Sequence, residues 1–316
     1  MSDKRKLLLL AVVAIALIAL FMTIEANGIW DYVLPRRAKK IAAIVLTGTA
    51  ISVSTVVFQT LTNNKILTPS LIGLDSLYLL LQTAIVFLFG STTLTAMNKN
   101  VQFAISTIVM VGFAGILYKL LFMRKGSGTI YFLLLVGIIC GSFFSSISEF
   151  MKMLLDPNEF MVVQDKMFAS FNNVNGDILI LAALAALAAI GFFYRDLKFL
   201  DVLALGREHA VNLGVPYDRV SKRLLVFTAL MVSVSTALVG PITFLGFLVA
   251  NVAYRLMGTF KHSVVLPATS LISFVALIGG QLIVERVFTF STSLSVILNF
   301  AGGIYFLYLL LKENRS

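Results

Sequence analysis

Long apolar runs alternate with short polar stretches along the whole chain, and this alternation predicts membrane-spanning helices. A hydrocarbon core about 30 Å thick requires about 20 apolar residues per helix, and only helices or closed barrels satisfy the backbone at that depth. Uninterrupted apolar runs of this length exclude a barrel. The runs predict ten spans, near residues 7–24, 41–61, 73–90, 101–121, 130–150, 178–194, 223–239, 244–258, 265–284 and 294–311.

The prolines support this segmentation. Gly240 and Pro241 separate two runs that hydropathy alone would join. All prolines are expected in loops or in the first turn of a span, where a missing N–H group costs least. They are Pro35, Pro69, Pro157, Pro216, Pro241 and Pro267. No small-residue cleavage site follows the first run, so we expect a retained first helix rather than a signal peptide.

The basic residues set the orientation of the predicted spans. With both termini in the cytoplasm, 17 of the 25 Lys and Arg residues lie on the inner side and 8 on the outer side. This distribution follows the positive-inside rule. Four of the outer eight, however, crowd into the short stretch 35–40. That local basic patch requires its own explanation.

Composition excludes a soluble protein and offers little chemistry. Hydrophobic residues make up 59% of the chain and charged residues 13%, against roughly 25% charged in soluble domains. The mean hydropathy is +0.96. One cysteine, Cys140, and two histidines without ligand-spaced neighbours disfavour a metal site or a membrane-embedded enzyme. The sequence also lacks a Gly-rich phosphate-binding loop. We therefore expect a non-catalytic transporter that binds no cofactor of its own.

The largest predicted inner loop, residues 195–222, carries an apolar pattern broken by glycines. Its apolar positions and glycines are Leu203, Leu205, Gly206, Ala210, Leu213, Gly214 and Val215. The pattern predicts two short helices with an apolar face outside the bilayer. Such a face either docks on a partner protein or lies on the lipid surface, and the pattern alone leaves both open.

Four stretches of the chain form motifs. They are Val33-Leu34-Pro35-Arg36, Phe58-Gln59 with the stretch from Asn63 to Ser76, the stretch from Leu205 to Val215, and Gly240-Pro241-Ile242-Thr243-Phe244-Leu245-Gly246-Phe247. Together they resemble FecCD-type permeases of ABC importers for iron chelates, haem and vitamin B12. The third motif is the most specific, since it resembles the family pattern Leu-Gly-x-x-x-Ala-x-x-Leu-Gly-Val closely. The first departs from the family's Arg-Leu-Pro-Arg by one missing arginine.

Other departures narrow the resemblance. Ala250-Asn251 stands where the family usually has Pro-His, and Leu74-Asp75-Ser76-Leu77 replaces a serine-rich start of the third helix. With Lys261-His262, these variants look like the subgroup that imports ferric siderophores of the petrobactin and catecholate type. An importer of the same family for haem or a cobalamin remains an alternative, as does an ion-coupled secondary transporter.

The resemblance implies one permease domain over residues 1–316 with a BtuC-like type II ABC importer fold, in the cytoplasmic membrane of a bacterium. It also implies a second permease subunit, identical or paralogous, two cytoplasmic ATP-binding subunits and an extracytoplasmic solute-binding protein. It implies no nucleic-acid partner. The residues implied to couple to the ATPase are Leu205, Gly206, Ala210, Leu213, Gly214 and Val215. Those implied to dock the binding protein are Arg36, Arg37 and Arg286.

Further polar or flexible residues are candidates for the pathway or gate. They are Gln59, Asp75, Gly126, Ser127, Thr129 and Asn251. Each has a structural alternative: interhelical hydrogen bonding for the two amides, a helix N-terminus for the carboxylate, and a flexible turn for the stretch 126–129. Lys39 and Lys40 are expected to anchor in lipid phosphates, and Glu149 with Lys152 to form a helical ion pair.

Overall fold

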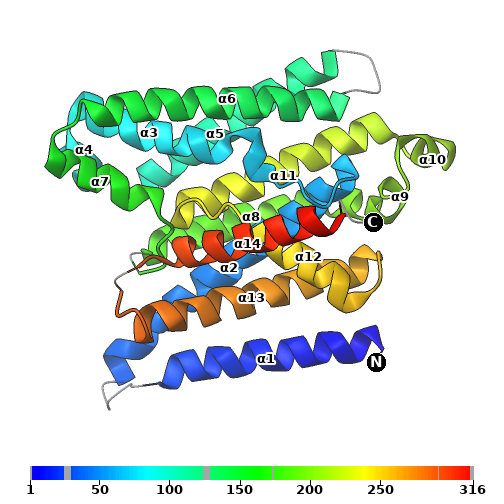
Figure 1. Cartoon of the computed structure of the whole chain (residues 1–316), viewed down its shortest axis with the longest axis horizontal. Coiled ribbons are helices and arrows are strands. Elements are labelled where there is room, and N and C mark those ends of the chain that lie inside the picture. The colour runs from blue at the N-terminus through cyan, green and yellow to red at the C-terminus, as the bar shows by residue number, and fades with distance from the viewer. Residues whose placement is uncertain (1, 25–29, 124–128, 173, 291, 314–316) are drawn as a thin grey trace.

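The computed structural model describes residues 2–24, 30–123, 129–172, 174–290 and 292–313, and it is built from helices (Figure 1). The α-helices are α1 (Asp3–Thr23), α2 (Trp30–Thr62), α3 (Leu74–Phe89), α4 (Ser91–Ala96), α5 (Lys99–Met123), α6 (Thr129–Met153), α7 (Pro157–Met167), α8 (Gly176–Leu197), α9 (Leu200–Leu203), α10 (Arg207–Asn212), α11 (Tyr217–Val239), α12 (Leu245–Met257), α13 (His262–Arg286) and α14 (Leu294–Glu313). A short 3-10 helix, η1 (Pro69–Ile72), precedes α3.

Each predicted span coincides with one of these helices. Helices α1, α2, α5, α6, α8, α11 and α13 are long and apolar enough to cross a membrane, while α3, α12 and α14 are shorter apolar helices. The all-helical polytopic class is therefore confirmed. That all ten helices cross the bilayer stays a prediction.

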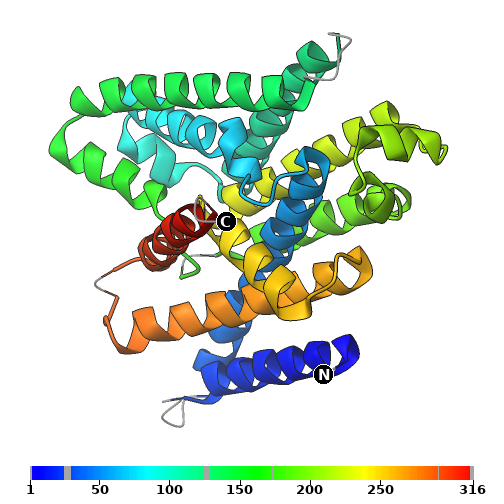
Figure 2. The same ribbon diagram turned by 45° about the vertical axis from the view of Figure 1, so that its right-hand side comes forward.

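Helix α2 is the central element of the bundle. It packs against α8, α11, α12 and α13, and from Ala43 to Thr62 most of its side chains are buried. Helices α6, α3 and α5 lie on one side of it and α13 and α1 on the other (Figures 1 and 2). Sequence-distant helices are thus held by one shared core helix.

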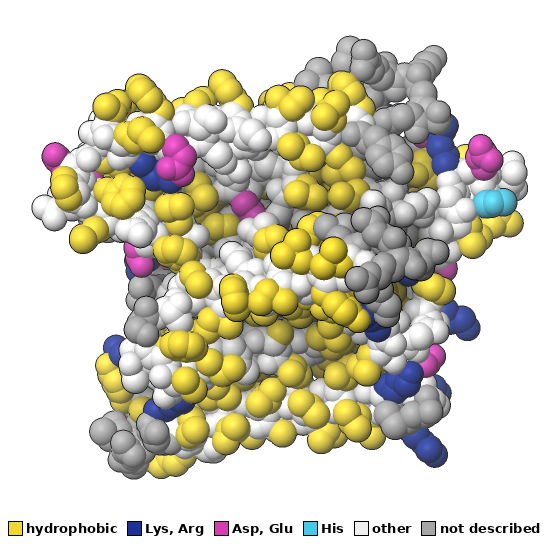
Figure 3. Space-filling model, viewed as in Figure 1, with side chains coloured by type: hydrophobic (Ala, Val, Ile, Leu, Met, Phe, Trp, Pro, Cys, Tyr) yellow, Lys and Arg dark blue, Asp and Glu magenta, His cyan; other side chains and the backbone are white. Residues whose placement is uncertain are grey.

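The two ends of the bundle differ in content. Helices α9 and α10 and both chain termini lie at one end, here called the inner end, and α4 and α7 lie at the other, the outer end (Figure 1). Apolar side chains cover the middle of the visible face, and Lys and Arg side chains gather toward the two ends (Figure 3). This distribution is typical of a protein that spans a membrane with its charges at the two surfaces.

The prediction for the prolines is wrong at two positions. Pro35 lies inside α2 and Pro267 inside α13, beyond the first turn of each helix. Each forfeits one backbone hydrogen bond, to the carbonyl four residues earlier. Those carbonyls belong to the exposed residues Asp31 and Ser263, where water can solvate them. Because α2 already begins at Trp30, the basic stretch 36–40, which was expected in a loop, lies on a helix.

Glycines allow α6 to approach the segment before α3 closely. A Cβ atom on Gly137 would lie 2.8 Å from the Cα atom of Ile72, and one on Gly141 would lie 3.1 Å from the Cα atom of Gly73. Gly73 itself has a φ of 86°, which favours glycine. Backbone-to-backbone packing therefore fixes where α3 begins.

Candidate functional site

The segment between α8 and α11 forms the predicted pair of short helices at the inner end. Helix α9 ends before Gly206, whose φ is 93°, and α10 is followed by Gly214, whose φ is 81°. Both glycines occupy backbone conformations that other residues rarely adopt. The two glycines of the motif are thus explained by the turns that they make.

The apolar residues of this segment divide between two roles. Leu203, Ala210 and Val215 are buried against the bundle, so these three do not belong to the exposed apolar face that was expected outside the bilayer. Leu205 and Leu213 are 56% and 64% exposed. The buried residues hold the segment against the bundle, and the exposed leucines are available to a partner.

A chain of short hydrogen bonds ties this segment to two long helices. The Oδ1 atom of Asp201 on α9 accepts hydrogen bonds from the backbone N–H of His262, at 2.8 Å, and from its ring Nδ1, at 2.7 Å. The His262 Nε2 atom lies 2.7 Å from Thr60 Oγ1 on α2. Movement of α9 is therefore linked to α13 and α2. Sequence reasoning missed this link; its only signal was the unusual pair Lys261-His262.

The charge state of Asp201 favours this link. Burial raises the pKa of its carboxyl group, but the hydrogen bonds from His262 and the nearby charges of His262 and Lys261 lower it, and the net pKa lies below the ordinary value. The carboxylate therefore stays ionised and keeps accepting both hydrogen bonds.

A cleft of about 680 Å³ lies beside this link at the inner end. Leu205 and Lys65 line it, and the Lys65 ammonium lies 4.5 Å from the centre of the Phe260 ring. Two candidate gate residues meet at Lys65, because the amides of Gln59, which also lines the cleft, and Asn251 both donate to the Lys65 carbonyl, at 2.6 and 3.0 Å. These amides hold the turn after α2, and their role in a gate stays a prediction.

Asp75 lies in the first turn of α3, as its helix-terminus interpretation requires. Its Oδ1 atom accepts a 3.1 Å hydrogen bond from the Thr236 hydroxyl on α11. The contact joins α3 to α11, and a role in the pathway stays a prediction. Gly126 and Ser127 lie outside the described residues, and Thr129 is the first residue of α6.

The three outer arginines have different surroundings. Arg37 donates to the carbonyls of Met22 and Ile24, at 3.1 and 2.7 Å, and Arg286 donates to Ile24 at 3.5 Å. Both therefore stabilise the C-terminal end of α1, where free carbonyls attract cations. Arg36 is exposed, with its guanidinium 4.2 Å from the centre of the Tyr32 ring. Docking of a binding protein stays a prediction, and Arg36 is the arginine best placed for it.

Two lysines at the outer end form ion pairs. Lys40 lies 2.8 Å from Glu285 of α13, so its expected role as a lipid anchor is wrong. Both partners are largely buried, and a buried ammonium requires a counter-charge. The predicted helical pair of Lys152 and Glu149 is confirmed. Lys39 is exposed, and its anchoring role stays a prediction.

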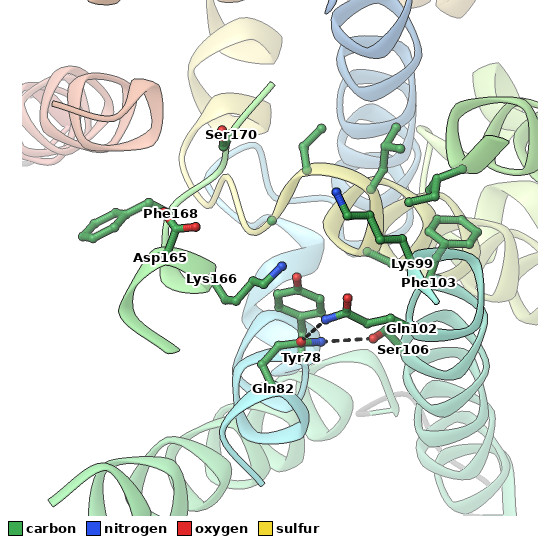
Figure 4. A pocket seen from close by; sticks show the side chains of 15 residues that line it. Tyr78, Gln82, Lys99, Gln102, Phe103, Ser106, Asp165, Lys166, Phe168 and Ser170 are labelled. Carbon is green, nitrogen blue, oxygen red and sulfur yellow. Dashed lines mark hydrogen bonds between the residues drawn. The ribbon is translucent and has the colours of Figure 1, made fainter. Parts of the chain in front are cut away.

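A polar pocket of about 110 Å³ opens at the outer end between α3, α5 and α7 (Figure 4). Gln102 donates to Gln82 at 2.6 Å, and Gln82 donates to Ser106 at 3.2 Å. Lys99 and Lys166 line the same pocket. Sequence reasoning missed it because its residues come from distant segments. Within the described ranges, no group of three or more His, Cys, Asp or Glu side chains could hold a metal ion.

Comparisons with known proteins cover nearly the whole chain. The profile of the FecCD transport family matches residues 7–312. The petrobactin import system permease protein YclO of Bacillus subtilis (strain 168) is 60% identical over 316 residues, all of both chains. The petrobactin import system permease protein FatC of Bacillus anthracis is 39% identical over 282 residues, 89% of this chain and 79% of that one.

A solved structure resembles this fold. It is an inward-facing conformation of a transporter assigned to the metal-chelate type of ABC transporters, with a TM-score of 0.84 and 19% sequence identity. The match covers 98% of this chain and 100% of the other. The predicted permease fold is therefore confirmed.

Proposed function

Since the chain belongs to the FecCD transport family, we propose that it is the permease subunit of an ABC importer that carries a ferric siderophore of the petrobactin type into the cytoplasm. The chain itself is a non-catalytic, multi-pass membrane subunit. ATP is hydrolysed by two partner subunits, and an extracytoplasmic protein delivers the chelate.

The substrate class is inferred from one observation, the similarity to known permeases. The relative that is identical at 60% of positions over its whole length is a petrobactin import permease, and so is the relative at 39%. Identity of this extent supports petrobactin over the alternatives of haem and cobalamin. The subunit would pair with an identical or paralogous permease in the cytoplasmic membrane of a bacterium, with both termini in the cytoplasm.

The inner end supports a coupling role. Leu205 and Leu213 expose large apolar surface on a segment whose backbone turns are fixed by glycines. Through Asp201 and His262 the segment is bonded to α13 and α2. When the ATPase subunits close on ATP, a displacement of this segment would move both helices as rigid bodies. The chelate would then pass by alternating access.

Reconstitution tests this proposal. The permease, its partner permease, the ATPase and the binding protein are placed in proteoliposomes, and uptake of radiolabelled ferric petrobactin, haem or cyanocobalamin is measured with internal ATP or with an ion gradient. We expect uptake of ferric petrobactin that requires ATP and the binding protein. Uptake by the permease alone under a proton or sodium gradient would refute the proposal in favour of a secondary transporter.

A further inference from the structure

The outer pocket brings two lysines together from separate elements. Lys99 lies in the first turn of α5, and Lys166 lies in the last turn of α7. In Figure 4 both side chains reach toward the space above Gln82 and Gln102. Tyr78, from α3, directs its hydroxyl group into the same space. Hydrogen-bond donors from three helices therefore surround one small volume.

One carboxylate, that of the exposed Asp165, lines the pocket beside these lysines without forming an ion pair with either. Neither ammonium has a carboxylate within 4.0 Å among the residues that the structure describes. Burial lowers the pKa of Lys166, as does the charge of Lys99, whereas Asp165 raises it. Lys99 also lies at the positive end of the α5 dipole, which disfavours a cation. An anion in the pocket would offset the repulsion between the two ammonium groups and the repulsion between Lys99 and the α5 dipole.

The pocket is part of a larger depression at the outer end. A second cavity, of about 380 Å³, shares Asp165, Phe168 and Ser170 with it. The first cavity, at about 110 Å³, is small beside the roughly 300–1,000 Å³ of sites that take up a whole small-molecule ligand. It can hold one carboxylate or one aromatic ring with oxygen substituents, but not a whole chelate. The second cavity offers room for more of the same ligand.

We propose that the lysine pocket is an outer binding subsite for one anionic oxygen group, a carboxylate or a catecholate, of the imported ferric chelate. This inference rests on the proposed function. Ferric iron is a hard cation, so its chelators present anionic oxygens. Lys99 and Lys166 supply the countercharge, the Tyr78 hydroxyl donates a hydrogen bond, and the Gln82–Gln102–Ser106 network fixes the floor of the pocket.

The test uses the complete importer in phosphatidylcholine proteoliposomes. Variants are Lys99→Gln, Lys166→Gln, the double variant, and the charge-retaining Lys99→Arg with Lys166→Arg. Lys39→Gln is the matched control, because Lys39 is an exposed outer lysine that does not line the pocket. We expect the double Gln variant to raise the KM for ferric petrobactin about tenfold at nearly unchanged kcat. The Arg pair and the control should stay near the wild-type KM.

Other outcomes would overturn the inference. An unchanged KM in a stably assembled double variant would do so. If the double variant lost affinity for the ligand-free binding protein and showed no other change, the lysines would be assigned to docking of that protein. An effect seen only when phosphatidylglycerol is added would assign them to lipid headgroups.

A separate measurement distinguishes failure of the proposed function. If the wild-type importer takes up no ferric petrobactin, binding of ferric citrate to the same preparation is measured by equilibrium dialysis. Weaker binding in the double Gln variant than in Lys39→Gln would still support an anion subsite. Equal binding in the two variants would overturn it.

Discussion

Substitution of Gly137 by alanine tests the backbone contact that positions α3. The added Cβ atom would lie 2.8 Å from the Cα atom of Ile72 and 3.3 Å from both its carbonyl carbon and oxygen. All three opposing atoms belong to the backbone, so no side chain can rotate away. Helix α6 must separate from η1, or η1 must shift with the start of α3.

The expected magnitude combines two opposing effects. Alanine in place of a helical glycine stabilises a helix by up to about 1 kcal/mol. Overpacking costs about 1–3 kcal/mol, and a contact with fixed backbone atoms belongs in the upper part of that range. The net loss for Gly137→Ala is therefore about 1–2 kcal/mol. Gly112 of α5 has no atom within 4 Å of its ideal Cβ position, so Gly112→Ala should be neutral or slightly stabilising.

Thermal unfolding of the purified importer in lipid nanodiscs measures the difference. A loss of 1–2 kcal/mol should lower the apparent Tm of Gly137→Ala by a few degrees, since about 1 kcal/mol shifts Tm by about 2–4 °C in chains of moderate size. Gly112→Ala should equal or exceed the wild-type value. If both variants unfold at the same temperature, close backbone packing is not what positions η1.

Three further predictions concern the two ends of the molecule. Leu213→Asp should abolish ATP-driven uptake and weaken association with the ATPase subunits at least tenfold, measured by co-purification, because it places a charge in an apolar contact; full association would exclude Leu213 from the interface. Folding lowers the pKa of Asp201, so the ionised carboxylate stabilises the fold above its unfolded pKa, and this stabilisation is lost as the pH falls through its folded pKa. Asp201→Asn should therefore remove part of the acid dependence of Tm below about pH 4. An unchanged pH profile of Tm would contradict the hydrogen-bonded link between Asp201 and His262. Arg36→Glu should weaken affinity for the binding protein in a salt-dependent way, whereas Arg37→Glu should mainly lower Tm; equal effects of both on affinity, at unchanged Tm, would contradict this division.

The sequence predicted the helices well because a membrane imposes long apolar runs that few other structures need. It failed at the outer start of α2, where Pro35 and several charges suggested a loop. In sequence analysis a proline beside several charges is read as the end of a helix, but an exposed helix end tolerates the one hydrogen bond that proline removes. The tertiary contacts of Arg37 with Ile24 and of Lys40 with Glu285 stabilise the helical conformation there, and they cannot be predicted from the local sequence.

Within the candidate coupling segment, residue types were predictable and their orientations were not. Leu203 and Leu205 are two positions apart and chemically identical, yet one is buried and the other exposed. Their difference depends on how the single turn of α9 packs on α2, which the short motif does not encode. Likewise Asp201 and His262, and Lys99 and Lys166, are more than 60 residues apart in each case and meet only after folding.

Helix α2 gives the two ends of the proposed importer a common body. It runs without a break from Trp30 to Thr62, and 33 residues at about 1.5 Å each span about 50 Å. Arg36 lies near its outer end, and Thr60, at its inner end, contacts His262. If the binding protein docks at Arg36, docking and ATPase coupling act on the same rigid helix. Any change in binding-protein affinity with nucleotide state must then be matched by an equal change in nucleotide affinity when the binding protein docks, because linkage between two sites is reciprocal.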